Sequence, residues 1–185
     1  HRCTHSKPNT GNVTSTRKPY GKRMRAIFIP HKGTDPGIEP GEYEQAGYDA
    51  DALELCQQAH YLAKWDAGAY GKVVKEGSKE DGTDAHSLNA ATISTIVPCT
   101  RSHGKNTIYA MNYGAADLKL GKMHGGGKKL GGEIRKALSE STPGMKQLNA
   151  WLAKMQEEEG SVISLYGRRI PIRHRHTALN TLLQG

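Results

Sequence analysis

Apolar residues recur every three or four positions in two long segments of this 185-residue chain. The first segment runs from about residue 52 to residue 66, and its apolar positions are Leu53, Leu55, Ala59, Leu62 and Ala63. The second runs from residue 144 to residue 159, with apolar positions at Met145, Leu148, Leu152 and Met155. Such spacing places one apolar stripe along a helix. Both segments are therefore predicted to be amphipathic helices.

Weaker patterns predict the remaining elements. Further helices are expected over 85–95, 101–113, 132–139 and from Thr177 onward. Short strands are expected over 25–29 and 45–49, and a hairpin over 162–172, where apolar residues alternate around Gly167. Loops are expected over 1–24 and over the Gly- and Pro-rich segment 32–42, with a charged turn at 77–82. The predicted fold class is a helix-rich α+β fold without internal repeats.

The composition adds a basic balance to this picture. The chain carries 26 Lys and Arg against 18 Asp and Glu, a formal net charge of +8. Excess positive charge favours a polyanionic partner, of which nucleic acid is the commonest. The three cysteines are widely spaced and form no C-x-x-C, which indicates a reducing compartment. No segment has the roughly 20 apolar residues that span a bilayer, so we expect a cytoplasmic protein with no membrane partner.

Both ends of the sequence have the character of internal positions. The first residues, His1 to His5, include neither an initiator Met nor the apolar core of a signal peptide. The last residues, Leu182 to Gly185, stop inside an apolar run. We therefore expect the 185 residues to be a fragment of a longer chain.

Four residues between positions 101 and 113 carry most of the chemical information. They are Arg101, Lys105, Tyr109 and Tyr113. Four residues advance a helix by about 400°, so each lies only about 40° round from the one before. Cations at the start of this four-residue stripe suit the phosphates of a nucleotide, and the rings beyond suit its sugar and base. The alternative is an ordinary amphipathic helix with solvated cations and packed tyrosines.

A pair of carboxylates lies upstream of the stripe. Asp49 ends a strand-like segment, and Glu54 follows at the start of the predicted helix. An Asp at the end of a strand is suited to hold Mg²⁺ beside substrate phosphates, because Mg²⁺ takes one or two protein carboxylates and keeps water or phosphate as its other ligands. Taken alone, Asp49 has the equally simple interpretation of a turn residue or a helix cap.

Taken in order, these segments resemble the family A DNA polymerases, particularly the replicative enzymes of bacteriophages. Residues 49–55, Asp-Ala-Asp-Ala-Leu-Glu-Leu, resemble motif A, whose pattern is Asp-x-Ser-x-(Ile/Leu)-Glu-(Leu/Phe)-Arg. The four-residue stripe with Gly114 resembles motif B, on the fingers helix that closes on the incoming nucleotide. Residues 167–169, Gly-Arg-Arg, and the run 176–184 resemble the segment that leads toward motif C. The resemblance covers essentially the whole chain and implies a partial palm and fingers of a right-hand polymerase.

The resemblance also implies a division of the chain. Residues 1–66 would form the palm entry and motif A, residues 67–140 the fingers with motif B at 101–114, and residues 141–185 the return toward the palm. Motif C, a His-Asp-Glu turn that supplies a second metal-binding Asp, does not occur in the sequence. We therefore expect that these 185 residues alone do not polymerise DNA.

The activity implied is transfer of a deoxynucleotide to a primer 3′-hydroxyl with two Mg²⁺ ions in viral DNA replication. Asp49 would ligate both ions, with the Ala50 carbonyl as a further ligand. The triphosphate would be held by His86, Arg101 and Lys105. Glu54 would lie under the sugar and exclude a 2′-hydroxyl. Tyr109 would stack near the nascent base and sugar, and Tyr113 would guard the template base.

The implied partners are primer–template DNA and deoxynucleoside triphosphates. Six residues would contact the DNA: Arg2, Asn9, Arg17, His176, Asn180 and Gln184. The resemblance leaves open whether the full-length protein also binds a processivity factor. The site of action would be the cytoplasm of the host cell if a phage encodes the chain.

Three positions depart from the family pattern. Asp51 stands where Ser is usual, Cys56 where Arg is usual, and Gly11 where Gln is common. Asp51 adds negative charge near the metal site, and Cys56 removes a cation that normally supports the motif A helix. Two alternatives stay open. The departures at Asp51 and Cys56 leave room for a defective polymerase relic, and the basic charge alone would suit a non-catalytic nucleic-acid-binding domain.

Other motifs have simpler interpretations. Residues 125–132, which are rich in Gly and Lys, do not fit the phosphate-binding pattern G-x-x-x-x-G-K-(S/T) and are expected to be a basic turn that enters a helix. His1, Cys3 and His5 have no second pair of ligands at zinc-finger spacing.

Overall fold

The computed structural model describes residue 16, residues 18–27 and residues 52–185. The chain divides into two compact units, His1–Asp51 and Ala52–Gly185. In the first unit, helix α1 covers Gly21–Arg25 and a turn follows at residues 26 and 27. The predicted loop is therefore wrong at residues 21–24 and the predicted strand is wrong at residues 25–27, whereas the turns and the bend at residues 16 and 18–20 agree with a loop. Backbone hydrogen bonds four residues apart, such as Met24 N to Tyr20 O, close this helical turn.

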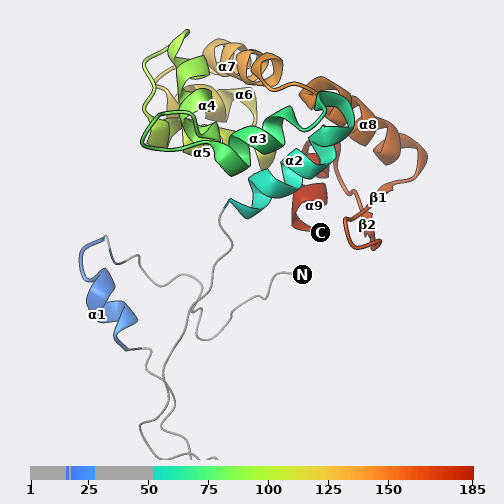
Figure 1. Ribbon diagram of the computed structural model, residues 1–185, viewed down its shortest axis with the longest axis horizontal. Helices are drawn as coiled ribbons and strands as arrows, with labels where there is room; N and C mark the ends of the chain where they lie inside the picture. Colours follow the sequence, from blue (N-terminus) through green and yellow to red (C-terminus); the bar gives the residue numbers. More distant parts are fainter. Residues whose placement is uncertain (1–15, 17, 28–51) are drawn as a thin grey trace, which may run out of the picture. The chain divides into compact units, whose positions relative to one another are not determined.

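The second unit consists of successive helices and one hairpin (Figure 1). Its helices are α2 (Leu53–Asp66), α3 (Ala69–Glu76), α4 (Ala85–Ser94), α5 (Arg101–Asn112), α6 (Asp117–Met123), α7 (Lys128–Ser141), α8 (Met145–Glu158) and α9 (Ala178–Gln184). Strand β1 (Ser161–Ile163) pairs antiparallel with β2 (Arg169–Pro171), with Val162 opposite Ile170. A 3-10 turn, Arg175–Thr177, leads into α9. The helix-rich α+β class is confirmed.

Two hydrophobic cores stabilise this unit. The first core joins α2, α3, α8, the hairpin region and α9 through Ala59, Leu62, Tyr70, Met145, Leu148, Leu152, Val162, Ile172, Ala178 and Leu182. The second core joins α4, α5, α6 and α7 through Ile93, Ile108, Met111, Leu120, Ile134 and Leu138. Figure 1 shows the same grouping, with α4–α7 at one end of the unit and α8, α9 and the hairpin at the other. Apolar burial within each group is the main force that holds its helices together.

The predicted helices at 52–66, 85–95, 101–113 and 144–159 and the hairpin are confirmed within a residue or two. Helices α3 and α6 were not predicted, and α7 begins at Lys128 rather than at residue 132. Glycines inside α6 and α7 weaken the local helix signal. The close packing of α6 against α7 requires these glycines. A Cβ at Gly121 would collide with the Gly127 carbonyl, and a Cβ at Gly131 would collide with the Asp117 carbonyl.

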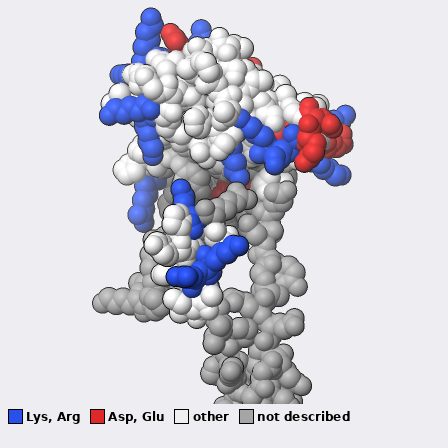
Figure 2. Space-filling model, turned by 90° about the vertical axis from the view of Figure 1, so that its left-hand side faces the viewer, with Lys and Arg blue, Asp and Glu red and all other residues white. Residues whose placement is uncertain are grey.

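The distribution of charged side chains over the surface is relevant to the predicted DNA partner, and the length of the helices is relevant to whether one could cross a membrane. Figure 2 shows Lys and Arg side chains spread over many parts of one face, whereas Asp and Glu side chains gather mainly in one place. Within the described residues, no helix is both long and apolar enough to cross a bilayer.

Candidate functional site

Helix α5 carries the four-residue stripe, of which Tyr109 packs against the second core. Thr100 caps the helix by accepting a hydrogen bond from the His103 N–H at 3.3 Å. Ile108 and Met111 are buried in the second core, whereas Lys105 is exposed and Tyr109 is half-buried. Tyr113, the residue that ends the helix, is 43% exposed. The stripe therefore combines an accessible cation with aromatic rings that are only partly packed.

Asp84 joins the starts of α4 and α5. Its carboxylate caps α4 by accepting from the backbone N–H groups of His86 and Ser87. The same carboxylate binds Arg101 in a bidentate ion pair, Nε to Oδ1 at 3.1 Å and Nη2 to Oδ2 at 2.6 Å. Hydrogen bonds from Arg101, and then from Ser87, hold the pKa of the Asp84 carboxyl well below its usual value, against the opposing effect of burial. Arg101 thus starts α5 at a fixed place beside α4.

A row of side chains continues from this ion pair along the stripe. The Lys105 Nζ lies 5.9 Å from the centre of the Tyr109 ring, within reach of a cation–π interaction. The Tyr109 ring also lies 5.8 Å from the His86 ring, at an interplanar angle of 48°. His86 is only 7% exposed, so α4 fixes it beneath the stripe. Lys105 and His86 thus lie near the same Tyr109 ring, and Arg101 lies one helical turn before Lys105. The predicted triphosphate residues are His86, Arg101 and Lys105.

The close packing of α4 against α5 depends on a glycine. A Cβ at Gly104 would lie 2.8 Å from the Ala90 backbone nitrogen and 2.9 Å from its Cα. Any other residue at position 104 would push the two helices apart. Since Gly104 and Lys105 are neighbours, the contact also sets the distance between His86 and the stripe.

Three distant elements meet at Tyr113. Its hydroxyl donates a hydrogen bond to Glu54 Oε1 at 3.2 Å, and Gln184 Nε2 donates to the same hydroxyl. Glu54 lies in the first turn of α2 and Gln184 at the end of α9. The structure therefore brings together three predicted site residues that lie up to 130 positions apart in the sequence. Glu54 was predicted for sugar selection, Tyr113 for the template base and Gln184 for DNA binding.

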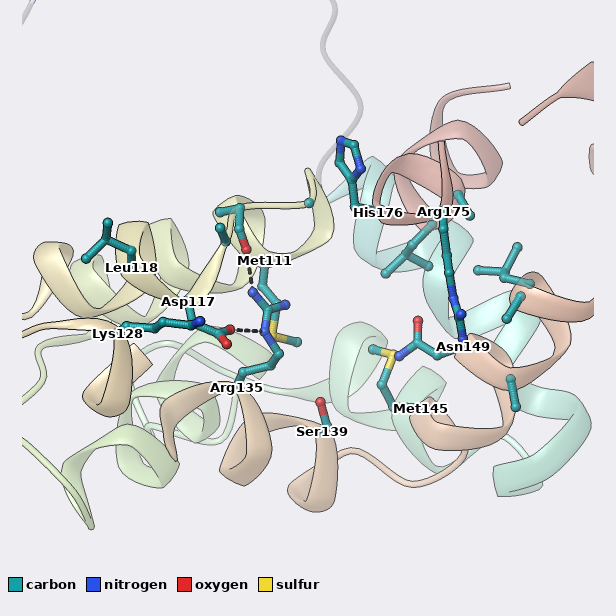
Figure 3. A pocket seen from close by; sticks show the side chains of 18 residues that line it. Met111, Asp117, Leu118, Lys128, Arg135, Ser139, Met145, Asn149, Arg175 and His176 are labelled. Carbon is teal, nitrogen blue, oxygen red and sulfur yellow. Dashed lines mark hydrogen bonds and ion pairs between the residues drawn. The ribbon is translucent and has the colours of Figure 1, made fainter. Parts of the chain in front are cut away.

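A cavity of about 1020 Å³ opens at Gly114, between the α5–α6 turn and helices α7, α8 and α9 (Figure 3). Figure 3 shows Arg135 reaching from α7 toward Asp117, with its Nε 2.6 Å from Asp117 Oδ1. Arg135 Nη2 also donates to the Ala115 carbonyl, which fixes the turn after α5. Lys128 and Arg175 add positive charge to the lining. The cavity is thus large, open and mainly basic in its charged groups.

His176 is the predicted DNA contact that lies at this cavity. The side chain is exposed and stacks on the His174 ring at a centroid distance of 5.5 Å. Gly114, at a φ of +78°, leaves no room for a Cβ, which would collide with the His176 carbonyl. Asn180 is half-buried on α9.

Several predicted site residues lie outside the described residues. They are Arg2, Asn9, Arg17, Asp49, Ala50 and the departures Gly11 and Asp51. Among the residues that the structure does describe, no three His, Cys, Asp or Glu side chains come together as a metal site. Cys56, the third departure, is exposed on α2.

Sequence reasoning missed the residues that hold the site in place. Asp84 and Arg135 act through ion pairs with residues 17 and 18 positions away. Tyr70, buried on α3, lies near Tyr109 and Cys56, which add to the effect of burial in raising the pKa of its phenol. The only sequence signal for Asp84 is its place before the helix at 85–95, which suits an N-cap.

No protein-family model matches the chain. The chain is 36% identical over its whole length to the DNA-directed DNA polymerase of Escherichia phage T7, and equally to that of Enterobacteria phage T3. Over 80% of its length it is 33% identical to the DNA-directed DNA polymerase of Escherichia phage Phieco32. The chain spans 27% of the length of the T7 and T3 proteins and 28% of that of the Phieco32 protein.

Proposed function

The chain belongs to the family A DNA polymerases of the phage T7 type, and from this membership we propose that its four-residue stripe binds the incoming nucleotide during template-directed DNA synthesis. The observation that carries the proposal is the arrangement on α5. An exposed Lys105 lies over Tyr109, which lies against His86, while the ends of the stripe contact Asp84 and Glu54. Along the stripe the cations come first and the aromatic rings follow, which matches the order of phosphates, sugar and base in a nucleotide.

We propose that Lys105, Arg101 and His86 hold the triphosphate. Lys105 acts as a compact point charge. Asp84 occupies the Nε and Nη2 side of Arg101, which leaves the Nη1 donors for a phosphate oxygen. Phosphoryl transfer depends mainly on positioning and on stabilisation of charge, so a pre-fixed Arg101 suits the reaction.

Glu54 and Tyr113 form the proposed sugar gate. Their hydrogen bond places a carboxylate and a phenol at one edge of the stripe. A ribose 2′-hydroxyl would need space and a hydrogen bond where these groups already bind each other. Tyr109, one turn earlier, would stack near the base and sugar, and Tyr113 would also border the template base.

The metal site is proposed from the family resemblance. Asp49, with the Ala50 carbonyl, would hold Mg²⁺, which supplies activation of the primer 3′-hydroxyl and neutralisation of charge on the leaving pyrophosphate. A further Asp from motif C is needed for a pair of ions, so we propose that these 185 residues alone do not extend a primer. The complete phage enzyme would act in the cytoplasm of the infected cell.

The DNA side of the site is proposed to lie along α9 and the cavity. Gln184 binds Tyr113, and His176 lies at the cavity edge, so both are near the end of the stripe. Asn180 lies one turn before Gln184 on the same helix. We propose that these residues contact the primer–template, together with Arg2, Asn9 and Arg17, and that the basic cavity accepts the template strand.

The two cores support the proposed division of the chain. The second core joins α4–α7, within the proposed fingers segment 67–140. The first core joins α2 to α8 and α9, within the proposed palm segments 1–66 and 141–185. Helix α3 is the exception, because Tyr70 belongs to the first core.

Glu54→Ala in the complete polymerase tests the proposed gate. We expect incorporation of ribonucleotides relative to deoxynucleotides to rise by about tenfold or more, because the carboxylate that blocks the 2′-hydroxyl is gone. The measurement is kcat/KM for each nucleotide in single-nucleotide primer extension, with the exposed α8 substitution Glu158→Ala as control. Unchanged sugar discrimination in Glu54→Ala would remove Glu54 from the gate.

A further inference from the structure

A buried pair of amide side chains joins α2 to α5 next to the Glu54–Tyr113 contact. Gln58 is 0% exposed and Asn112 is 2% exposed. Asn112 Nδ2 donates a hydrogen bond to Gln58 Oε1 at 2.9 Å. Gln58 follows Glu54 by one helical turn, and Asn112 directly precedes Tyr113. The same two helices are therefore joined by two successive side-chain hydrogen bonds, one buried and one at the surface.

The buried bond is the harder of the two to break. Gln58 Nε2 and Asn112 Oδ1 are buried without a hydrogen-bond partner within the described part of the chain. A shift of α5 along α2 would break the hydrogen bond between Asn112 and Gln58. Because both amides are buried, water could not replace the lost bond, so the shift would be costly. Tyr113 is 43% exposed, so water can replace its bond to Glu54.

We propose that Gln58 and Asn112 are positioning residues that fix Tyr113 beside Glu54 and thereby set how strongly the site rejects a 2′-hydroxyl. This inference rests on the proposed role of Glu54 and Tyr113 in sugar selection. A gate of this kind requires that its side chains be placed to within roughly 0.5–1 Å. A hydrogen bond between two buried side chains supplies part of that placement, because it restricts how far α5 can shift along α2.

The test uses the complete polymerase that contains this chain. Asn112→Leu removes the hydrogen bond and keeps a side chain of similar size, and Gln58→Leu removes it from the other side. We expect each variant to lower the ratio of deoxynucleotide to ribonucleotide kcat/KM by about fivefold. Because the pair acts as one unit, the double variant Gln58→Leu/Asn112→Leu is expected to lose no more discrimination than either single variant.

A swap of the two amides provides the rescue. Gln58→Asn/Asn112→Gln keeps an amide on each helix and the same summed side-chain length, so we expect the wild-type discrimination ratio to return. If the leucine variants fail to fold, this swap carries the test. A swap variant that is as stable as the wild type but lacks its discrimination would overturn the inference, and one that keeps both would support it.

Two further variants separate the outcomes. Leu138→Ala, in the second core on α7, lowers stability without touching the pair and should leave discrimination unchanged. If Glu54→Ala relaxes discrimination and Asn112→Leu does not, the positioning role is wrong and the gate stands. If neither variant changes discrimination, the proposed gate itself is wrong. Additive losses in the double variant would also overturn the inference, because the residues would then act separately.

Discussion

Tyr109 lies near both a cation and an imidazole in the candidate nucleotide site. The Lys105 Nζ lies 5.9 Å from its ring, and the His86 ring lies 5.8 Å away. The resemblance to the family A DNA polymerases implies that a Tyr at this position goes with easy acceptance of dideoxynucleotides, and we propose this for Tyr109. The hydroxyl of Tyr109, rather than its ring, is therefore the group whose removal should change selection at the sugar 3′ position.

We predict that Tyr109→Phe lowers incorporation of dideoxynucleotides relative to deoxynucleotides by about tenfold or more. The ring still stacks, so incorporation of deoxynucleotides should change little. The measurement is the ratio of kcat/KM values for the two nucleotides in the complete polymerase. Tyr166→Phe, in the hairpin turn where Tyr166 is 87% exposed, is the matched control. Equal ratios in Tyr109→Phe and the wild type would contradict the assignment.

Single residues of the site differ in how far the sequence could predict them. The stripe was predictable because a helix period of 3.6 brings residues at steps of four onto one side. Asp84, Arg135 and the Gln58–Asn112 pair were not, because each acts across two helices whose packing is set by distant residues such as Gly104 and Gly131. Spacing along the chain carries no signal for such contacts.

At the scale of the elements, the ion pair between Asp84 and Arg101 joins α4 to α5. The pKa of the Asp84 carboxyl is lowered in the folded protein, chiefly by the Arg101 hydrogen bonds. Because the pKa is lower in the folded state, the ionised Asp84 carboxylate stabilises the fold at a pH above its unfolded-state pKa of about 4. This stabilisation is lost as the pH falls below that value toward the folded-state pKa. The junction of α4 and α5 should therefore weaken in acid.

We predict that Asp84→Ala lowers the free energy of local opening of α4 by about 1–2 kcal/mol at pH 7, because the helix loses its N-cap and Arg101 loses its partner. Amide hydrogen exchange at α4 in the complete protein measures this energy. Asp84→Asn keeps a capping oxygen but not the charge, so it should lose less. The difference between the wild type and Asp84→Ala should shrink below about pH 4. A difference that does not change with pH would argue against an ionised Asp84 as the cause.

The long amphipathic helices were predicted well, and so was the short α9, whereas the short helices α3 and α6 were not. Helices α2 and α8 have 14 residues each and a regular apolar pattern. Helices α3 and α6 have eight and seven residues, too few to show a period, and each contains a glycine. In α3 the decisive feature is Asp66, which accepts from the Gly68 and Tyr70 N–H groups. That contact starts a new helix directly after α2.

At the scale of the whole molecule, the chain spans about a quarter of its phage relatives. We predict that the purified 185 residues do not extend a primer with Mg²⁺ and all four deoxynucleotides, because the motif C carboxylate is not among them. A primer-extension assay measures this directly, with the complete polymerase as the positive control. Template-dependent extension above the buffer control would contradict the proposed need for a second Asp.

Lys105 offers the most direct test of the central claim, that the four-residue stripe binds the incoming nucleotide. In the complete polymerase, Lys105→Ala should lower kcat/KM for deoxynucleotides by about a hundredfold, because a charge on the triphosphate loses its partner. The Kd for primer–template DNA should change less than about twofold. The exposed α6 substitution Lys119→Ala is the matched control and should leave the nucleotide kcat/KM near the wild-type value. Equal losses of nucleotide incorporation and DNA binding in Lys105→Ala would instead place this lysine on the DNA backbone and contradict the account.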